Sequence, residues 1–244
     1  NIDILKSNKI KAFYVGLPKC ASTWLFHTLK NFKNIGLSTP RDLHFFDLYF
    51  FRGEKWYHNF FNMKNELNID ICHDYVLYKS AIERIYKYNK KALIIYHCRD
   101  PVKLVFSLYK ETRRSNFIYF KEHGYNAPKT FKEFIENPLT KKILNYKEHL
   151  DCILNFFPND QIFSSTLNYI KSNPNKYLNN LLKKMDSSTP INHEEIFIIR
   201  PNKDNIFINF CVRIFSKISV LVRKNGNPLL MRIISFKSLL LLKK

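Results

Sequence analysis

The stretch Phe13-Tyr-Val-Gly-Leu-Pro-Lys-Cys-Ala-Ser-Thr-Trp-Leu25 decides how this chain folds. An apolar, β-prone run, 12–15, meets a short turn at Gly16-Leu-Pro18, and an amphipathic segment begins at Trp24. A strand that feeds a helix through such a turn aims the unpaired N–H groups and positive dipole end of the helix at one point. A positive charge and two hydroxyl donors are added there by Lys19, Ser22 and Thr23. The stretch therefore predicts a site for a phosphate or sulfate group, as in a nucleotide.

The order of residues in this loop differs from the common nucleotide loop G-x-x-x-x-G-K-[ST], in which lysine opens the helix. Here Lys19 precedes the two hydroxyl residues, and Ala21 stands where a second glycine is expected. This order resembles the phosphosulfate-binding loop of the sulfotransferases, P-K-x-G-[ST]-[ST]-W-L, and departs from it only at the alanine. A strand–turn–helix corner with an incidental lysine is the alternative. The resemblance implies that the sulfate donor PAPS, 3′-phosphoadenosine 5′-phosphosulfate, is bound by Lys19, Cys20, Ala21, Ser22, Thr23 and Trp24.

A second segment predicts another strand of the same sheet. The uninterrupted apolar run 92–97 is typical of a strand buried on both faces of a parallel sheet. Arg99 follows at the expected carboxyl edge, and Ser107 lies on the next expected helix. Arginine offers a planar fork to phosphate oxygens, and a serine hydroxyl can complete the cage. The segment resembles the sulfotransferase signature R-[ND]-P-x-x-x-x-x-S-x-Y, which implies that Arg99 and Ser107 hold the 3′-phosphate of PAPS.

A third segment, Pro40-Arg-Asp-Leu-His-Phe-Phe-Asp47, resembles the K-E-x-H-F-F stretch of the glycan-type sulfotransferases, including the heparan sulfate enzymes. The resemblance implies that Asp42, at the glutamate position, removes the proton of the acceptor and that His44 assists. Aspartate is one methylene shorter than glutamate, and Arg41 replaces the lysine. A turn aspartate beside a packed histidine is the alternative interpretation. His73 lies where many members of the family carry a lysine that points into the site.

Strands and helices are expected to alternate along most of the chain. The expected strands are 11–16, 69–73, 92–98 and 161–166, and the expected helices are 22–32, 79–88, 102–114, 131–136, 140–156 and 174–185. Residues 36–62 are expected to form an aromatic-rich loop region with short helical turns, suited to an acceptor pocket, and 116–130 a flexible crossing loop. This alternation predicts an α/β protein with a central, mostly parallel sheet and helices on both faces. With the loop at Lys19, it predicts a P-loop-like three-layer fold.

Residues 1–203 are predicted to form this domain and residues 204–244 a basic, amphipathic helical extension. From residue 205 onward the chain has eight basic and no acidic residues, and Gly226-Asn-Pro228 divides it into two helices. Such helices either pack their apolar stripe on the domain or lie on an anionic membrane. No apolar run is long enough to span a bilayer.

The five cysteines are widely spaced and odd in number, and no pair has zinc-like spacing. They predict reduced thiols in a cytoplasmic protein and no metal site, although a trimmed N-terminal leader or anchor stays open. Cys20 sits in the donor loop, where N–H dipoles and Lys19 could lower the pKa of its thiol. A structural thiol is favoured over a nucleophile because no partner base is apparent in the sequence.

The 244 residues carry a net charge of +20, from 40 basic and 20 acidic side chains. Part of this charge suits a donor with several negative charges, and the remainder suggests an acidic glycan or an anionic membrane as partner. A solvated basic surface is an equally good explanation. The sequence has no zinc finger and no aromatic RNA-binding signature, so no specific nucleic acid is expected.

The resemblance implies an enzyme that moves a sulfuryl group from PAPS to an acceptor hydroxyl and releases PAP, the 3′,5′-bisphosphate. A carbohydrate acceptor is favoured, with a phenol or another small molecule as the alternative. Lys19 is expected to neutralise charge on the leaving oxygen, and the monoanionic sulfuryl group removes the need for magnesium. Two other classes stay open: a P-loop-type nucleotide kinase or NTPase, with Asp100 as its candidate metal ligand, and a non-catalytic anion- or membrane-binding protein.

Overall fold

The computed structural model describes residues 9–65, 67–185, 217–218 and 220–232. The chain divides into two compact units. The first consists of Asn1–Arg99 and Tyr146–Ile199, and the second of Asp100–Asn145 and Arg200–Lys244. All strands of the sheet belong to the first unit, so this unit carries the predicted donor loop.

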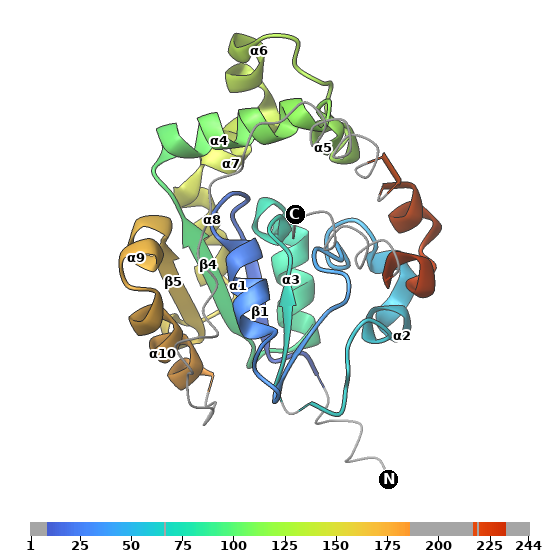
Figure 1. Ribbon diagram of the computed structural model, residues 1–244, viewed down its shortest axis with the longest axis vertical. Helices are drawn as coiled ribbons and strands as arrows, with labels where there is room; N and C mark the ends of the chain where they lie inside the picture. Colours follow the sequence, from blue (N-terminus) through green and yellow to red (C-terminus); the bar gives the residue numbers. More distant parts are fainter. Residues whose placement is uncertain (1–8, 66, 186–216, 219, 233–244) are drawn as a thin grey trace. The chain divides into compact units, whose positions relative to one another are not determined.

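The first unit is built on a five-stranded parallel sheet with the strand order β2-β3-β1-β4-β5 (Figure 1). The strands are β1 (Ala12–Gly16), β2 (Ile35–Leu37), β3 (Leu67–Ile71), β4 (Leu93–Cys98) and β5 (Ile162–Thr166). Ala12 of β1 lies between Ile69 of β3 and Leu93 of β4. The three central strands are buried almost throughout, as the continuous apolar runs of a parallel sheet predict. The predicted parallel sheet is therefore confirmed.

Helices cover both faces of this sheet because neighbouring residues of each strand point to opposite sides. Tyr14 and the alternate residues of β3 and β4 pack against α1 (Ser22–Leu29), α9 (Leu167–Ser172) and α10 (Pro174–Lys184). Phe13 points the other way and meets Tyr88 at the end of α3 (Lys79–Tyr88).

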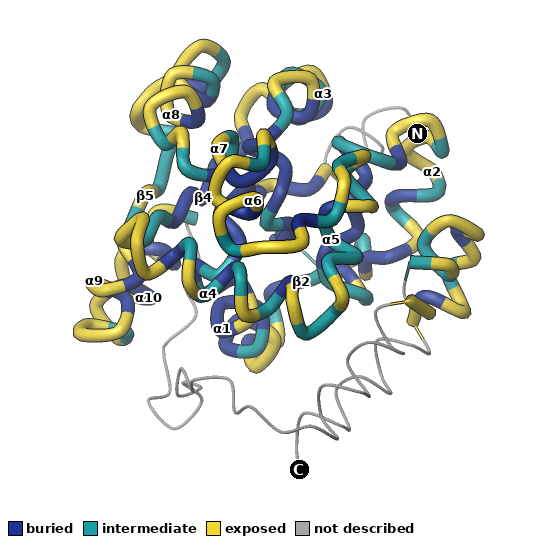
Figure 2. The backbone as a smooth tube through the Cα atoms, turned by 90° about the horizontal axis from the view of Figure 1, so that it is seen from above, coloured by how far each residue is buried: buried dark blue, intermediate teal, exposed yellow. Residues whose placement is uncertain are grey.

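On that second face, β4 also contacts α8 (Tyr146–Leu154), where the ring centroids of Tyr96 and His149 lie 6.2 Å apart. The short α2 (Gly53–His58) reaches the same face through Tyr57, which hydrogen-bonds Asp70 of β3. Figure 2 shows the resulting layers, with β4 coloured as buried and the outward turns of α8 and α9 as exposed. The predicted three-layer α/β fold is confirmed for this unit.

The second unit is helical in its described residues. Its helices are α4 (Pro101–Arg114), α5 (Ile118–Glu122), α6 (Phe131–Glu136) and α7 (Pro138–Leu144). Aromatic contacts join them, with ring centroids 5.1 Å apart for Tyr109 and Phe134 and 5.6 Å apart for Phe120 and Phe134. Residues 220–225 and 228–232 are also helical.

The described part of the C-terminal segment bears out one detail of its prediction. Its helices are interrupted at Gly226 and Asn227, as the Gly-Asn-Pro sequence predicted. Arg223 pairs with Glu122 at 2.6 Å, so this segment contacts α5 within the same unit. The rest of the predicted extension, 204–216 and 233–244, lies outside the described residues. None of the helices in the described residues has the length and apolar content that crossing a bilayer requires.

Several expected boundaries were wrong. Residues 36–62 contain the expected short helical turns, Phe50–Arg52 and α2, but β2 begins at Ile35 and adds an unexpected edge strand beside β3. The expected crossing loop 116–130 contains α5, which forms because Phe120 is fully buried. The expected helix 140–156 is two helices, separated by the non-helical backbone of Asn145. The short α9 was not predicted, because six residues carry too little periodicity to reveal a helix.

Candidate active site

The predicted donor loop connects β1 directly to α1. Lys19 and Ala21 both have left-handed backbone conformations, with φ of 61° and 74°, and α1 begins at Ser22. Gly16 is required at the end of β1 because a Cβ there would lie 2.5 Å from a methyl carbon of Val76. Thr23 is exposed at the start of the helix, where unpaired N–H groups collect. Ser22 is buried, at 7% exposed, so the loop presents a cation, the Thr23 hydroxyl and a helix N-terminus together.

Trp24, the last residue of the predicted donor set, packs its side chain in the core. It is 5% exposed, and its ring centroid lies 5.6 Å from that of Tyr177 on α10. Its indole therefore anchors α1 to the sheet, and its backbone is the part that belongs to the loop.

The buried side of the donor loop is hydrogen-bonded to His97, which no sequence motif had marked as a functional residue. Its Nδ1 lies 3.0 Å from the carbonyl oxygen of Cys20 and its Nε2 lies 2.6 Å from the hydroxyl of Tyr177. Burial lowers the pKa of His97 to about 4, so the ring is neutral, donates from Nδ1 and accepts at Nε2. Tyr14 also donates to the Cys20 carbonyl, at 3.3 Å. A histidine at the end of an apolar strand was the signal available in the sequence.

The thiol of Cys20 is fully buried beside these contacts. Burial raises the pKa of Cys20 to about 12, and the Cys98 thiol adds to this effect. The opposing Arg99 and Lys19 charges are the smaller influence. A thiol that stays protonated at neutral pH is inert, which favours the structural interpretation of Cys20.

Arg99 lies at the carboxyl end of β4, next to the donor loop. Its guanidinium donates to the backbone carbonyl of Lys19 at 3.3 Å, although 80 positions separate the two residues in sequence. Its own carbonyl accepts from the Tyr146 hydroxyl at 2.7 Å. In the sheet, β1 and β4 are neighbours. The next strand in sequence after β1, which is β2, lies on one side of this pair, and the next after β4, which is β5, lies on the other side. The direction in which successive strands are added therefore reverses between β1 and β4. Open α/β sheets bind ligands at the carboxyl edge of such a switch point, and Lys19 and Arg99 both follow the strands that form it.

Two further residues of the Arg99 motif lie in the second unit. The carboxylate of Asp100 accepts from the backbone N–H of Lys103 at 2.8 Å and caps α4, with Pro101 at the first helical position. This contact gives Asp100 a structural explanation that requires no metal. Ser107 is half-buried on α4 between the buried Leu104 and Leu108.

The predicted base, Asp42, is 7% exposed and lies beside the end of β3. Its N–H donates to the carbonyl of Ile71 at 3.0 Å. One carboxylate oxygen lies 2.7 Å from Nδ1 of His73, and the other lies 2.9 Å from Nε of Arg41. A second nitrogen of Arg41 donates to the Thr23 hydroxyl. Arg41 therefore links the predicted base to the donor loop.

Asp42 and His73 influence the pKa of one another. Burial raises the pKa of the Asp42 carboxyl, but Arg41 and His73 outweigh burial and hold that pKa well below its usual range. Burial lowers the pKa of His73, but Asp42 and Asp74 outweigh it and raise that pKa. Nε2 of His73 lies 3.3 Å from the Asp74 carboxylate. His73 thus lies between two carboxylates that favour its protonated form.

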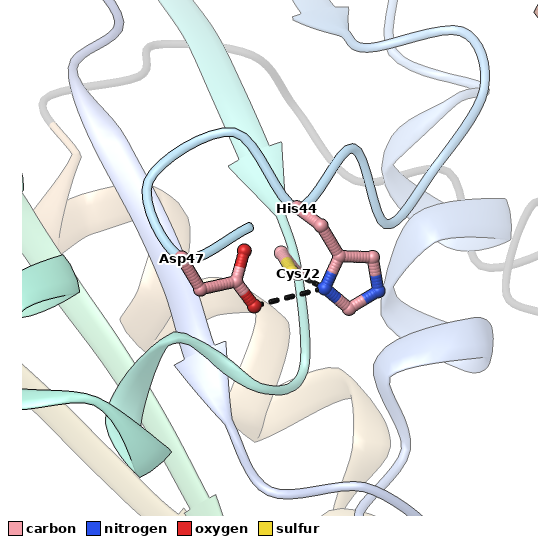
Figure 3. Close-up of side chains that lie close together, drawn as sticks. All are labelled: His44, Asp47 and Cys72. Carbon is pink, nitrogen blue, oxygen red and sulfur yellow. Dashed lines mark hydrogen bonds and ion pairs between the residues drawn. The ribbon is translucent and has the colours of Figure 1, made fainter. Parts of the chain in front are cut away.

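His44, the second predicted catalytic residue, is buried and has a left-handed backbone with φ of 53°. Its Nδ1 lies 2.9 Å from Oδ2 of Asp47 and 3.6 Å from Sγ of Cys72 (Figure 3). Burial lowers the pKa of His44, but Cys72 and Asp47 outweigh it and raise that pKa. Because burial also raises the pKa of Cys72 and keeps its thiol protonated, the Asp47 carboxylate is the more important cause.

The aromatic residues that follow His44 divide into a buried and an exposed group. Phe45 and Phe46 are fully buried, and Phe45 stacks on Tyr57 with ring centroids 4.4 Å apart. Phe51 is 78% exposed, and the guanidinium of Arg52 lies 5.2 Å from its ring centroid. Most of the aromatic region therefore serves as core, and its exposed part is small.

Comparison with known proteins finds likeness at the level of structure. No family model and no curated protein sequence matches the chain. A sulfotransferase from Alicyclobacillus acidocaldarius is similar over 93% of this chain and 96% of its own, with a TM-score of 0.62 and 16% identity. A mouse sulfotransferase complexed with PAP is similar over 86% of this chain and 66% of its own, with a TM-score of 0.52 and 14% identity.

A sulfotransferase domain from the curacin biosynthetic pathway is also similar, over 80% of this chain and 79% of its own. Its TM-score is 0.50 and its identity 13%. These identities are low, so the likeness concerns the path of the backbone and the order of the strands. The protein therefore has the α/β fold of the sulfotransferases.

Proposed function

We propose that this protein is a sulfotransferase that moves the sulfuryl group of PAPS to the hydroxyl group of an acceptor. The observation that carries the proposal is the contact between Arg99 and Lys19 at the switch point of the sheet. Two motifs that resemble the donor-binding signatures of sulfotransferases thereby meet at one edge. The sulfotransferase fold supports the same activity, and the similar mouse enzyme is complexed with PAP.

In this proposal the donor spans the two motifs. Ser22, Thr23 and the amides of the loop hold the 5′-phosphosulfate, and Arg99 holds the 3′-phosphate. The acceptor oxygen attacks sulfur in line while the bond from sulfur to the bridging phosphate oxygen breaks. Lys19 neutralises the charge that develops on that oxygen as PAP leaves. Catalysis is then mostly positioning and fixed charge.

Asp42 takes the proton of the acceptor hydroxyl. The position of Asp42 supports this assignment, because its carboxylate is ionised and Arg41 links it to Thr23 of the donor loop. His73 and Arg41 orient the carboxylate from two sides. His44 lies 6.0 Å from His73, ring centroid to ring centroid, and assists in placing the acceptor.

A carbohydrate acceptor is favoured by the likeness of the Asp42 segment to glycan-type enzymes. Exposed Phe51 beside Arg52 adds an aromatic face and a cation, which suit a sugar ring with an acidic substituent. A phenol is the alternative acceptor. Transfer from radiolabelled PAPS to a panel of glycans, phenols and amines distinguishes these classes, and contact of the C-terminal segment with an anionic membrane stays a separate prediction.

A thermal-shift comparison tests the donor assignment. PAP should raise the melting temperature at concentrations where ATP and anionic lipid vesicles have little effect, because only PAP has both the 5′- and the 3′-phosphate. A larger shift with ATP would favour a kinase or NTPase, and a shift with vesicles alone would favour a non-catalytic membrane-binding protein.

The role of Lys19 is tested separately. Lys19→Ala should abolish detectable transfer while PAP still raises the melting temperature, because the loop amides and Arg99 remain. Lys30→Ala, an exposed lysine at the far end of α1, is the matched control and should transfer normally. If Lys19→Ala retains most of the transfer rate, the assignment of Lys19 is wrong.

A further inference from the structure

Three side chains with the donor atoms of a metal site meet in the first unit: His44, Asp47 and Cys72 (Figure 3). One nitrogen, one carboxylate oxygen and one sulfur lie within 4.8 Å of one another. His44 and Cys72 are fully or nearly fully buried, and the side chain of Asp47 is 0% exposed. The sequence predicted no metal site because 28 positions separate His44 from Cys72 and no ligand spacing is visible along the chain.

The two partners of His44 converge on the same nitrogen. Oδ2 of Asp47 is 2.9 Å and Sγ of Cys72 is 3.6 Å from Nδ1. A ring nitrogen holds at most one proton, so it cannot donate to Asp47 and accept from the Cys72 thiol at the same time. A proton relay through histidine uses its two nitrogens, one for each partner. A cation bonded to Nδ1, Oδ2 and Sγ accounts for both contacts, as does one N–H shared between the oxygen and the sulfur.

The spacing and chemistry of the three atoms suit zinc. Ligands at about 2.0–2.3 Å from a tetrahedral zinc ion lie about 3.3–3.7 Å from one another. The nitrogen–sulfur distance of 3.6 Å falls in this range, and the nitrogen–oxygen distance of 2.9 Å needs to open slightly. A thiolate, an imidazole and a carboxylate together favour zinc over magnesium or calcium, which prefer oxygen ligands alone.

Surrounding groups orient these ligands as they do in metal sites. The second oxygen of Asp47 accepts from the N–H of Leu48 at 2.9 Å, which turns Oδ2 toward His44. On the far side of the imidazole, Nε2 lies 3.9 Å from the carboxylate of Asp74. This distance is too long for a hydrogen bond, so Asp74 acts on the imidazole through its charge. The N–H groups of Leu48 and Tyr49 donate to the His44 carbonyl and hold the turn that places these residues.

We propose that His44, Asp47 and Cys72 bind a zinc ion through Nδ1, Oδ2 and Sγ. Binding displaces the thiol proton of Cys72, so the affinity rises with pH. The inference stands without the proposed function, because zinc binding requires no donor and no acceptor. One consequence does rest on the proposed function: zinc on His44 should slow sulfuryl transfer, and a chelator should restore it.

Binding is tested on the full chain after treatment with a chelator. Addition of Co²⁺ as a spectroscopic probe should give a thiolate-to-metal charge-transfer band in the near ultraviolet that saturates at one equivalent. Zn²⁺ should displace the Co²⁺ and remove the band. X-ray absorption of the zinc-loaded protein should give a single sulfur ligand with nitrogen or oxygen ligands. Absence of the band, or a zinc shell without sulfur, overturns the proposal even if no variant folds.

Variants assign the band to this cluster. Cys72→Ser should lose the band and bind Zn²⁺ at least tenfold more weakly, and Asp47→Asn should keep a band but weaken binding. Cys152→Ser, which changes a half-buried cysteine on α8, is the matched control and should bind like the unchanged protein. A Cys72→Ser protein with native circular dichroism and an unchanged band would also overturn the proposal. None of these measurements uses PAPS, so they succeed or fail independently of the transferase assignment.

Discussion

Left-handed backbone conformations gather at the candidate site. Lys19, Ala21, Asp42 and His44 all have φ between 53° and 74° without being glycine. Each such residue costs about 1–2 kcal/mol, so the surrounding structure must impose these conformations. At Ala21 the resemblance to the sulfotransferase loop predicted a glycine, and the backbone found there is the one that glycine adopts freely.

We expect Ala21→Gly to stabilise the protein by about 0.5–1 kcal/mol, because relief of the left-handed strain exceeds the added entropy of the unfolded chain. Urea unfolding measures the change. Ala81→Gly, at a buried position inside α3, is the control and should destabilise by about 1 kcal/mol or more. A loss of stability in Ala21→Gly would show that the loop does not strain the alanine.

Asp42→Asn should lower kcat by about a hundredfold or more, because an amide cannot accept the proton of the acceptor. The PAP-induced shift in melting temperature should remain. Asp160→Asn, at an exposed position before β5, is the matched control and should transfer at the normal rate. A normal rate in Asp42→Asn would move the base to His44 or His73.

At the scale of elements, two adjacent residues between β4 and α4 have different roles. Arg99 follows the last residue of β4, and its side chain contacts the donor loop. Asp100 is the N-cap residue of α4. The Arg-Asp-Pro sequence thus combines a ligand-binding side chain with a helix start signal. An aspartate followed by proline at the first helical position is a strong N-terminal signal, which explains why the start of this helix was predicted within one residue.

Asp100→Ala should cost about 1 kcal/mol of stability through loss of the cap, and Asp100→Asn should cost little because asparagine caps equally well. Urea unfolding of both variants measures the effect. Asp100→Asn should also retain sulfuryl transfer. A folded Asp100→Asn protein without transfer activity would indicate that the carboxylate binds a metal or the substrate, as the kinase alternative requires.

At the scale of the whole molecule, one buried carboxyl group in the sheet is hydrogen-bonded to two tyrosines that pack against the sheet. Asp70 of β3 is 0% exposed and accepts from the hydroxyls of Tyr57 at 2.7 Å and Tyr75 at 2.9 Å. Burial raises the pKa of Asp70 to about 7, and the two hydroxyls oppose this effect only in part. The native state therefore holds this proton more tightly than the unfolded chain does.

Stability should consequently fall as the pH rises from the unfolded pKa of 3.8 to the native pKa of about 7 and then level off, because only in this range does the native state alone hold the Asp70 proton. A rise of this size corresponds to a loss on the order of 4 kcal/mol at most. Asp70→Asn, which keeps the shape without the charge, should remove most of this dependence. Urea unfolding at about pH 5 and about pH 8 tests it, and an equal pH dependence in both proteins would contradict it.

Asp42 was assigned through the resemblance to glycan-type sulfotransferases. The sequence alone predicted the parallel sheet, the helix layers and the places of Lys19 and Arg99. Those features depend on hydrophobic periodicity and turn residues, which act over a few neighbouring positions. The edge strand β2 and the short α5 escaped prediction because each has few residues of its own and forms by packing against its neighbours.

Only the tertiary structure decided which side chains meet at the candidate site. Arg41 reaches Thr23 across 18 positions, His73 reaches Asp42 across 31, and His97 reaches Cys20 across 77. Local patterns carry no record of such contacts, because they form when separate strands bring their carboxyl ends to one edge. The pKa shifts of Asp42 and His73, and the contacts of Asp47 and Cys72 with His44, also depend on the folded structure, because charge and burial act through space.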